Sequence, residues 1–168
     1  MKLQCAVKIA LSVAIPGFLA LGMVSLPADA ATATSSFAVT ATIASTCLVS
    51  ATALGFGSYS GLVVPASSTV SVTCTNTTPY VVGLSAGLGT GATVTTRKMT
   101  GPASALLAYG LFQDAGHTVG WGVTAGTDTV AGTGNGATQP ITVYGQIPTA
   151  QYVAPGAYAD TITVTVTY

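Results

Sequence analysis

The hydrophobic and polar residues of this chain alternate over several long stretches, and the first of these begins near residue 35. From Ser35 to Thr46 the sequence reads Ser-Ser-Phe-Ala-Val-Thr-Ala-Thr-Ile-Ala-Ser-Thr, in which apolar and small polar side chains take turns. A period of two residues is typical of a β-strand with one buried face. The pattern therefore predicts an N-terminal strand, which can complete the sheet of its own domain or the sheet of a neighbouring molecule.

The remainder of the chain predicts further strands joined by turns. Runs rich in valine and threonine cover residues 69–75, 80–85, 138–144 and 158–168, and Gly, Pro, Ser and Asn clusters separate them. Residues 103–109 are the one arguable helix, but the apolar side chains from Leu106 to Phe112 fit a buried strand at least as well. Many short strands and no sustained helical period predict one antiparallel β-sandwich domain of the immunoglobulin-like kind.

The last of these runs, residues 158–168, alternates most regularly. Its even-numbered residues share one face, and its odd-numbered residues, mostly threonines, share the other. The even-numbered set is Tyr158, Asp160, Ile162, Val164, Val166 and Tyr168. We expect a closing strand over 158–168 with an unpaired edge beside the core, which is an aggregation liability unless something covers it.

The first thirty residues predict a signal peptide. Lys2 and Lys8 precede an apolar stretch from about residue 9 to residue 24, and Ala28-Asp29-Ala30 then supplies the small-x-small pattern of a cleavage site. The alternative is a membrane anchor, but Pro16 interrupts the apolar stretch, which is also short for a span. We expect cleavage after Ala30, export, and no stable membrane insertion afterwards.

Charge is scarce in residues 31–168, which carry only Arg97, Lys98, Asp114, Asp128 and Asp160. A nearly neutral domain lacks the basic field that nucleic acids and anionic membrane surfaces require, so we expect neither as a partner. Low charge instead favours association between protein copies.

Two cysteines follow the predicted cleavage site, Cys47 and Cys74. In an oxidising compartment an isolated pair most often forms a disulfide. A metal site is disfavoured because the pair lacks CxxC spacing and His117 is the one histidine in the chain.

Catalytic interpretations are weaker than structural ones throughout the chain. His117 follows Asp114-Ala115-Gly116 in what reads as a hairpin turn, so we expect an exposed turn residue and not a general base. Asp160 has few acids to pair with and is expected to hold a loop through backbone hydrogen bonds. We predict no enzyme activity and no cofactor.

Two further features have competing readings. The glycine-rich runs 87–91 and 132–136 suggest phosphate-binding loops, but neither opens a predicted helix, so hairpin loops are favoured. Trp121 is the sole tryptophan, and we expect it to anchor the core, the alternative being an exposed aromatic that binds sugar or a surface.

An ordered set of short motifs spans the chain after the predicted cleavage site. In sequence these are Cys47, Phe56-Gly57-Ser58-Tyr59, Val72-Thr73-Cys74-Thr75, Tyr80 with Val82 and Leu84, Arg97-Lys98-Met99, residues 107–109, Leu111-Phe112-Gln113-Asp114, Trp121-Gly122, Val143-Tyr144-Gly145-Gln146-Ile147-Pro148 and Gly156-Ala157-Tyr158-Ala159-Asp160-Thr161. In this order they resemble the spore coat protein U domain family, which includes subunits of archaic, Csu-type chaperone-usher pili.

The resemblance implies an incomplete immunoglobulin-like β-sandwich, the pilin fold, whose missing strand leaves a hydrophobic groove. It implies that a periplasmic chaperone first fills the groove and that, at an outer-membrane usher, the N-terminal donor strand of an identical or related subunit replaces the chaperone. Carried onto this sequence, the inward-facing donor residues are Phe37, Val39, Ala41 and Ile43, and the family's disulfide pair is Cys47 and Cys74.

These inferences divide the chain into a signal peptide (1–30), a donor-strand extension (31–43) and a pilin domain (44–168). We expect a structural subunit of a surface fimbrium that is exported through the periplasm and supports adhesion and biofilm formation. The alternatives are a stand-alone secreted β-sandwich that binds a ligand and a spore coat structural protein.

Overall fold

A computed structural model describes residues 30–168 of the chain. The predicted signal peptide, apart from Ala30, lies outside the described residues. The chain divides into two units at Thr40, so residues 30–40 and residues 41–168 are described separately.

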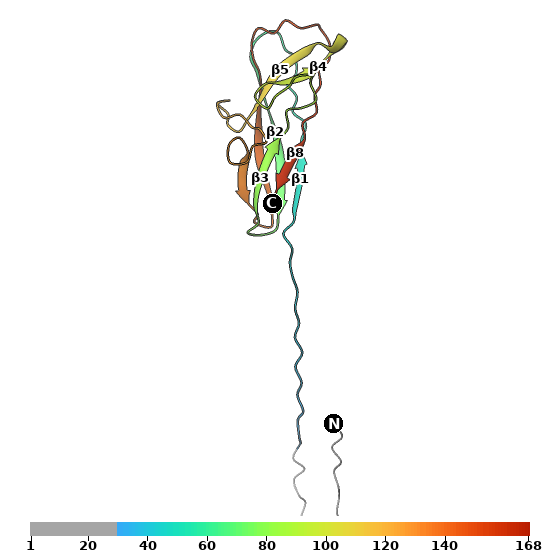
Figure 1. The fold of residues 1–168 in the computed structure, drawn as a ribbon, viewed down its shortest axis with the longest axis vertical. Coiled ribbons are helices and arrows are strands. Elements are labelled where there is room, and N and C mark those ends of the chain that lie inside the picture. The colour runs from blue at the N-terminus through green and yellow to red at the C-terminus, as the bar shows by residue number, and fades with distance from the viewer. Residues whose placement is uncertain (1–29) are drawn as a thin grey trace, which may run out of the picture. The chain divides into compact units, whose positions relative to one another are not determined.

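The domain from residue 41 onward is built from strands (Figure 1). The elements in order are β1 (Cys47–Ala51), β2 (Val64–Cys74), β3 (Pro79–Leu84), β4 (Arg97–Thr100), a short 3-10 turn (Pro102–Ser104), β5 (Leu106–Phe112), β6 (Val130–Thr133), β7 (Thr138–Ile147) and β8 (Val164–Thr167). One sheet has the order β1-β2-β7-β5-β4, the other has the order β6-β3-β8, and all pairs are antiparallel. The predicted all-β sandwich is confirmed.

The longest ladder explains how the alternating pattern builds the core. Strands β2 and β7 pair from Val64↔Ile147 to Thr73↔Thr138. Directly opposed residues of antiparallel strands point to the same face, so Val70 and Val72 turn inward while Ser71 and Thr73 turn outward. The buried apolar set is Val70, Val72, Cys74, Tyr80, Val82, Leu84, Met99, Leu107, Tyr109, Leu111, Trp121, Val143 and Ile147.

Two sequence predictions about the core are confirmed. The run that could have been a helix forms β5, with Leu107, Tyr109 and Leu111 buried. The Trp121 side chain is fully buried, and its indole N–H donates to the Val82 carbonyl at 2.9 Å. Trp121 is therefore a core anchor and not an exposed sugar-binding aromatic.

The prediction of a continuous strand over 158–168 is wrong in its first half. Strand β8 begins only at Val164. Before it, Ala159 bridges to Thr100, next to the five-stranded sheet, whereas the backbone N–H of Ser85, beside the three-stranded sheet, donates to the Thr163 carbonyl. The segment changes partners between the two sheets, which prevents one continuous ladder. The alternation of its side chains persists through Val166, but Tyr168 is exposed.

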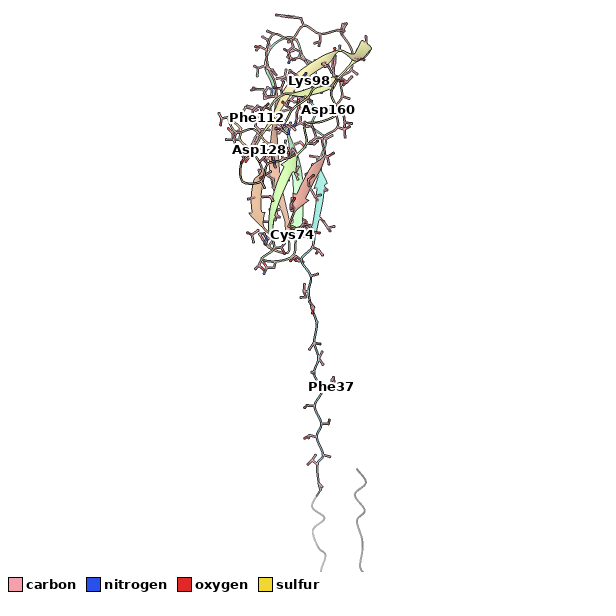
Figure 2. All side chains as sticks on the ribbon, in the orientation of Figure 1. Phe37, Cys74, Lys98, Phe112, Asp128 and Asp160 are labelled. Carbon is pink, nitrogen blue, oxygen red and sulfur yellow. A yellow bond between two sulfur atoms is a disulfide. The ribbon has the colours of Figure 1, made fainter. Side chains whose placement is uncertain are left out.

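The predicted N-terminal strand is not formed in this single chain. Residues 30–46 have no strand assignment. The exposed fractions of Phe37, Val39 and Ile43 are 88%, 83% and 87%; Phe37 is labelled in Figure 2. A strand needs a neighbour for its backbone hydrogen bonds, so an alternating sequence alone does not make one.

His117 also departs from its prediction. It lies in the expected turn, which the Asp114 carboxylate holds by accepting from the backbone N–H groups of Thr118 and Val119 at 3.0 and 2.7 Å. Its ring, however, is half-buried and packs edge-on against Phe112 and Tyr144, with centroid distances of 5.2 and 6.5 Å. Its backbone φ of 55° lies in the left-handed region, as is common in tight turns.

Candidate functional site: an open groove between the sheets

Two strand edges are free on one side of the sandwich. Strand β1 ends the order of the five-stranded sheet, and β8 ends the order of the three-stranded sheet. The two strands contact each other and lie side by side in Figure 1. The backbone groups on these edges are available to pair with a further strand.

The inward faces of these two strands are poorly covered. Val49 in β1 is opposite Val72 in β2 and points to the same face, yet Val49 is 42% exposed while Val72 is fully buried. In β8, Val164 and Val166 are only half-buried, although their partners in β3, Leu84 and Val82, are fully buried. The sandwich therefore lacks cover over its core along this edge.

A cavity of about 430 Å³ opens along the same edge. Its lining includes the buried core residues Val70, Leu84, Met99, Tyr109, Leu111 and Val143. One wall comes from residues 51–54 with Phe56, and the other comes from residues 158–162 with Val164. A second cavity of about 810 Å³ shares Leu54, Phe56, Met99 and Tyr158 with the first and extends to residues 57–61 and 151–157. The two cavities are therefore neighbours in one groove, and the first of them is mostly apolar.

Asp160 fixes the wall that leads into β8. Its Oδ1 accepts from the backbone N–H groups of Leu88 and Thr161, both at 2.7 Å, and its Oδ2 accepts from the Tyr109 hydroxyl at 2.7 Å. Burial, followed by this hydrogen bond, raises the pKa of Tyr109, so the phenol remains protonated and acts as the donor. The prediction that Asp160 holds a loop through backbone hydrogen bonds is confirmed.

A glutamine side chain replaces a missing backbone partner near the other end of the groove. The β5–β7 ladder stops at Gly110↔Gln146, and two residues further the same register would set Ala108 opposite Pro148, which has no N–H to donate. The Gln151 side chain takes this place: its Oε1 accepts from the Ala108 N–H at 2.7 Å, and its Nε2 donates to the Ala108 carbonyl at 2.9 Å. The Tyr59 hydroxyl donates to the Pro148 carbonyl and accepts from the Gln151 N–H, so it fastens the same loop.

Replacing Gln151 with leucine is expected to lower the free energy of unfolding by about 2 kcal/mol, because both backbone groups of Ala108 lose their partner in a partly buried place. Urea denaturation measures the change. Gln113→Leu is the control, since the Gln113 side chain donates one hydrogen bond, to the Gly120 carbonyl. Equal effects of the two substitutions would contradict the special role of Gln151.

A buried arginine supports the core behind the groove. Arg97 is fully buried, and its guanidinium donates to the carbonyls of Ser85, Val94, Leu84 and Trp121 at 2.8, 2.7, 2.9 and 2.6 Å. Burial lowers the pKa of Arg97, and the negative charges of Asp160 and Asp128 oppose that effect. The sequence marks Arg97 as one of the five charged residues in 31–168 and as part of a motif, but its burial was not predicted. The available signal was its spacing of two residues from Met99, which places both side chains on the inward face of β4.

The remaining predicted site residues have the following positions. Cys47 and Cys74 are joined by a disulfide that links the first residue of β1 to the last residue of β2. Phe37, Val39, Ala41 and Ile43 are exposed in a stretch without strand structure. The two glycine-rich runs lie in the β3–β4 connection and around the β6–β7 turn, and neither precedes a helix.

Potential metal-ligating side chains are scattered over residues 30–168. No group of three or more His, Cys, Asp and Glu side chains there is placed to hold a metal ion. Within that same range, the structure contains no helix with the length and apolar character needed to cross a bilayer.

Comparisons with known proteins agree with this architecture. The family model of the Spore Coat Protein U domain matches residues 33–165. The chain is 36% identical over 159 residues to Protein U of Myxococcus xanthus, a match that covers 84% of this chain and 88% of that protein.

A solved structure shares the fold. It is the crystal structure of the CsuC–CsuE chaperone–tip adhesion subunit pre-assembly complex from the archaic chaperone-usher Csu pili of Acinetobacter baumannii. One of its chains matches with a TM-score of 0.56 and 23% identity, over 76% of this chain and 41% of that chain, so this chain spans less than half of it. From the family match and the identity to Protein U, we conclude that the chain belongs to the Spore Coat Protein U domain family.

Proposed function

We propose that this protein is a structural subunit of a surface fimbrium, assembled by donor-strand exchange along a chaperone-usher pathway. The observation that carries the proposal is the groove, where the inward faces of β1 and β8 remain uncovered between two free strand edges. The similarity to a chain in a chaperone–subunit complex of Csu pili supports the same class of partner.

The groove has the chemistry of a site for β-strand addition. Thr163 is hydrogen-bonded to Ser85 beside β3, and the backbone groups of successive strand residues point to opposite edges. Ile162, Val164 and Val166 therefore direct their backbone groups to the free edge and their side chains inward. An added strand would gain a hydrogen-bond ladder and would place every second side chain in the apolar groove.

The N-terminal extension of another copy has the matching properties. Residues 31–46 have no charged side chain, and Phe37, Val39, Ala41 and Ile43 fall at alternate positions. Phe37 to Ile43 would span about 23 Å as a strand. This segment has as many residues as the groove wall from Tyr158 to Val164, so the two can pair along their whole length. In the proposed fibre Phe37, Val39, Ala41 and Ile43 enter the groove of the preceding subunit.

An energy comparison explains why a chaperone is part of the proposal. Burying Phe37, Val39 and Ile43, with a smaller gain from Ala41, contributes roughly 5 to 9 kcal/mol. Ordering about ten flexible residues costs on the order of 10 to 20 kcal/mol. The backbone ladder and the burial of the groove itself must supply the difference. A subunit without an occupant is therefore expected to be poorly stable until a periplasmic chaperone, and then another subunit delivered at an outer-membrane usher, fills it.

The proposed fibre would be exposed at the cell surface, where it would support adhesion and biofilm formation. Residues 1–30 would direct export, residues 31–43 would form the donor strand, and residues 44–168 would form the acceptor domain. Each subunit then contributes one strand and one groove, and a continuous fibre results from repeating that contact.

Deleting residues 31–43 tests the proposal. Fibres of the unaltered protein should give a ladder of oligomers in unboiled samples on a sodium dodecyl sulfate gel, and the ladder should collapse on heating. The deletion should abolish the ladder while chaperone binding survives, because the groove is intact. A soluble, cooperatively folded monomer whose N-terminal residues resist proteolysis would instead indicate a stand-alone module.

A matched pair of substitutions sharpens the test. Val39→Asp places a charge on the inward face of the proposed donor strand, whereas Thr40→Asp places the same charge on the outward face. Val39→Asp should abolish the ladder and Thr40→Asp should preserve it. Equal behaviour of the two variants would refute the assigned donor face.

A further inference from the structure

The groove wall between Tyr158 and Val164 crosses from one sheet to the other. At its start, Ala159 exchanges two backbone hydrogen bonds with Thr100, at 2.8 and 3.1 Å. At its end, the Ser85 N–H donates to the Thr163 carbonyl, and the Thr163 N–H donates to the Ser85 hydroxyl. Residues 160–162 lie between these two anchors, outside both ladders.

One carboxylate holds this crossing segment against both layers. Tyr109 reaches Asp160 from β5 of the five-stranded sheet, and Leu88 reaches it from the connection that follows β3 of the other sheet. The third hydrogen bond, from the Thr161 N–H, fixes the backbone directly after Asp160. Asp160 itself comes from the connection into β8 (Figure 2).

The close approach of Asp160 is built into the opposite loop. Gly87 has a φ of +85°, and a Cβ atom at that position would lie 2.0 Å from Asp160 Oδ2. A side chain at residue 87 would therefore displace the carboxylate, besides straining the backbone. The carboxylate also lines the 430 Å³ cavity together with Tyr109, Tyr158 and Ile162.

From these contacts we infer that Asp160 is a positioning residue for strand acceptance: it fixes residues 160–162 so that their free backbone edge faces the groove. This inference rests on the proposed function, because it assigns the residue that prepares the acceptor wall. We assign this role to the hydrogen bonds of the side chain and not to its charge, because each of its three contacts with the segment and the two sheets is a hydrogen bond from an N–H or O–H group.

The distinction between hydrogen bonding and charge gives a rescue test. In Asp160→Asn the amide oxygen still accepts from Leu88 and Thr161, and the amide NH₂ donates to the Tyr109 oxygen. In Asp160→Ala all three bonds are lost. A third variant, Val130→Ala, destabilises β6, which is the edge of the three-stranded sheet opposite to β8, and does not touch the groove.

The experiment uses the chain from residue 31 to residue 168 and a fluorescent synthetic peptide with the sequence of residues 31–46. Anisotropy gives the Kd of the peptide, and hydrogen–deuterium exchange of the peptide-free chain reports on residues 158–163. Asp160→Ala should raise Kd by at least about tenfold and accelerate exchange in 158–163 selectively. Asp160→Asn should stay within about threefold of the unaltered protein, because it retains its hydrogen bonds. Val130→Ala should accelerate exchange without singling out 158–163.

Each other outcome counts against a specific claim. Unchanged peptide binding in Asp160→Ala, or equally poor binding in Asp160→Asn, would overturn the positioning role. If hydrogen–deuterium exchange in Asp160→Ala rises as uniformly along the chain as in Val130→Ala, Asp160 contributes only to the overall stability of the domain and does not position the wall. If the unaltered chain binds no peptide, the donor-strand proposal fails, and the exchange comparison still decides whether Asp160 fixes the wall.

Discussion

Replacing Arg97 with methionine is expected to lower the free energy of unfolding by at least about 3 kcal/mol, because the substitution removes every donor that the guanidinium supplies. Methionine fills a similar volume but leaves the carbonyls of Leu84 and Trp121 buried without a partner. Two further carbonyls, of Ser85 and Val94, lose their bonds in a partly buried setting. Urea denaturation, followed by the fluorescence of the buried Trp121, measures the loss.

The neighbouring lysine supplies a matched control for this prediction. Lys98 is half-buried on the outward face of β4, and its ammonium makes one long contact, of 3.5 Å, with the Thr90 carbonyl. Lys98→Met should change stability by less than about 1 kcal/mol. Arg97→Lys should destabilise as well, because one ammonium group cannot reach carbonyls spread around a planar guanidinium. An Arg97→Met protein as stable as Lys98→Met would show that the buried network contributes nothing.

Removing the disulfide by changing both Cys47 and Cys74 to serine is expected to cost about 3 to 4 kcal/mol in the loop-entropy description. The effect should be concentrated in β1, because this edge strand of five residues pairs only with β2 and is largely exposed. Urea denaturation gives the total loss, and hydrogen–deuterium exchange of residues 47–51 locates it.

Reduction provides the internal comparison for the disulfide prediction. Dithiothreitol should shift the urea midpoint of the unaltered protein toward that of the double-serine variant, and it should leave the variant itself unchanged. A double-serine protein whose β1 amides exchange as slowly as before would contradict the idea that the covalent link holds the edge strand.

The strands that form the core could be predicted because their signal is local. In β5 every second residue is buried, and in β7 the same holds from Val143 to Ile147. Both strands include short runs rich in apolar residues, and such a run is a local feature of the sequence. The pairing of Cys47 with Cys74 and the burial of Trp121 could be predicted from composition. Two cysteines in an exported domain usually form a disulfide, and a single large aromatic residue usually packs in the core.

The parts that escaped prediction depend on partners distant in sequence. Gln151 binds both backbone groups of Ala108, which lies 43 residues earlier in the sequence, and only the fold brings the two together. The sequence of residues 158–163 gives no local signal that the segment crosses between the sheets, because its side chains alternate as in a regular strand. His117 reads as a turn residue, and nothing nearby in sequence indicates that its ring packs against Tyr144.

The disulfide has a mechanical consequence for a fibre of the proposed kind. Any tension along such a fibre would enter each subunit through its N-terminal extension and arrive at Cys47. Because Cys47 is bonded to Cys74, the force passes covalently into β2 and bypasses the short ladder between β1 and β2. Strand β2 in turn pairs with β7 over ten residue pairs. The tensile limit of the subunit would then be set by its broadest pair of strands and not by its weakest edge.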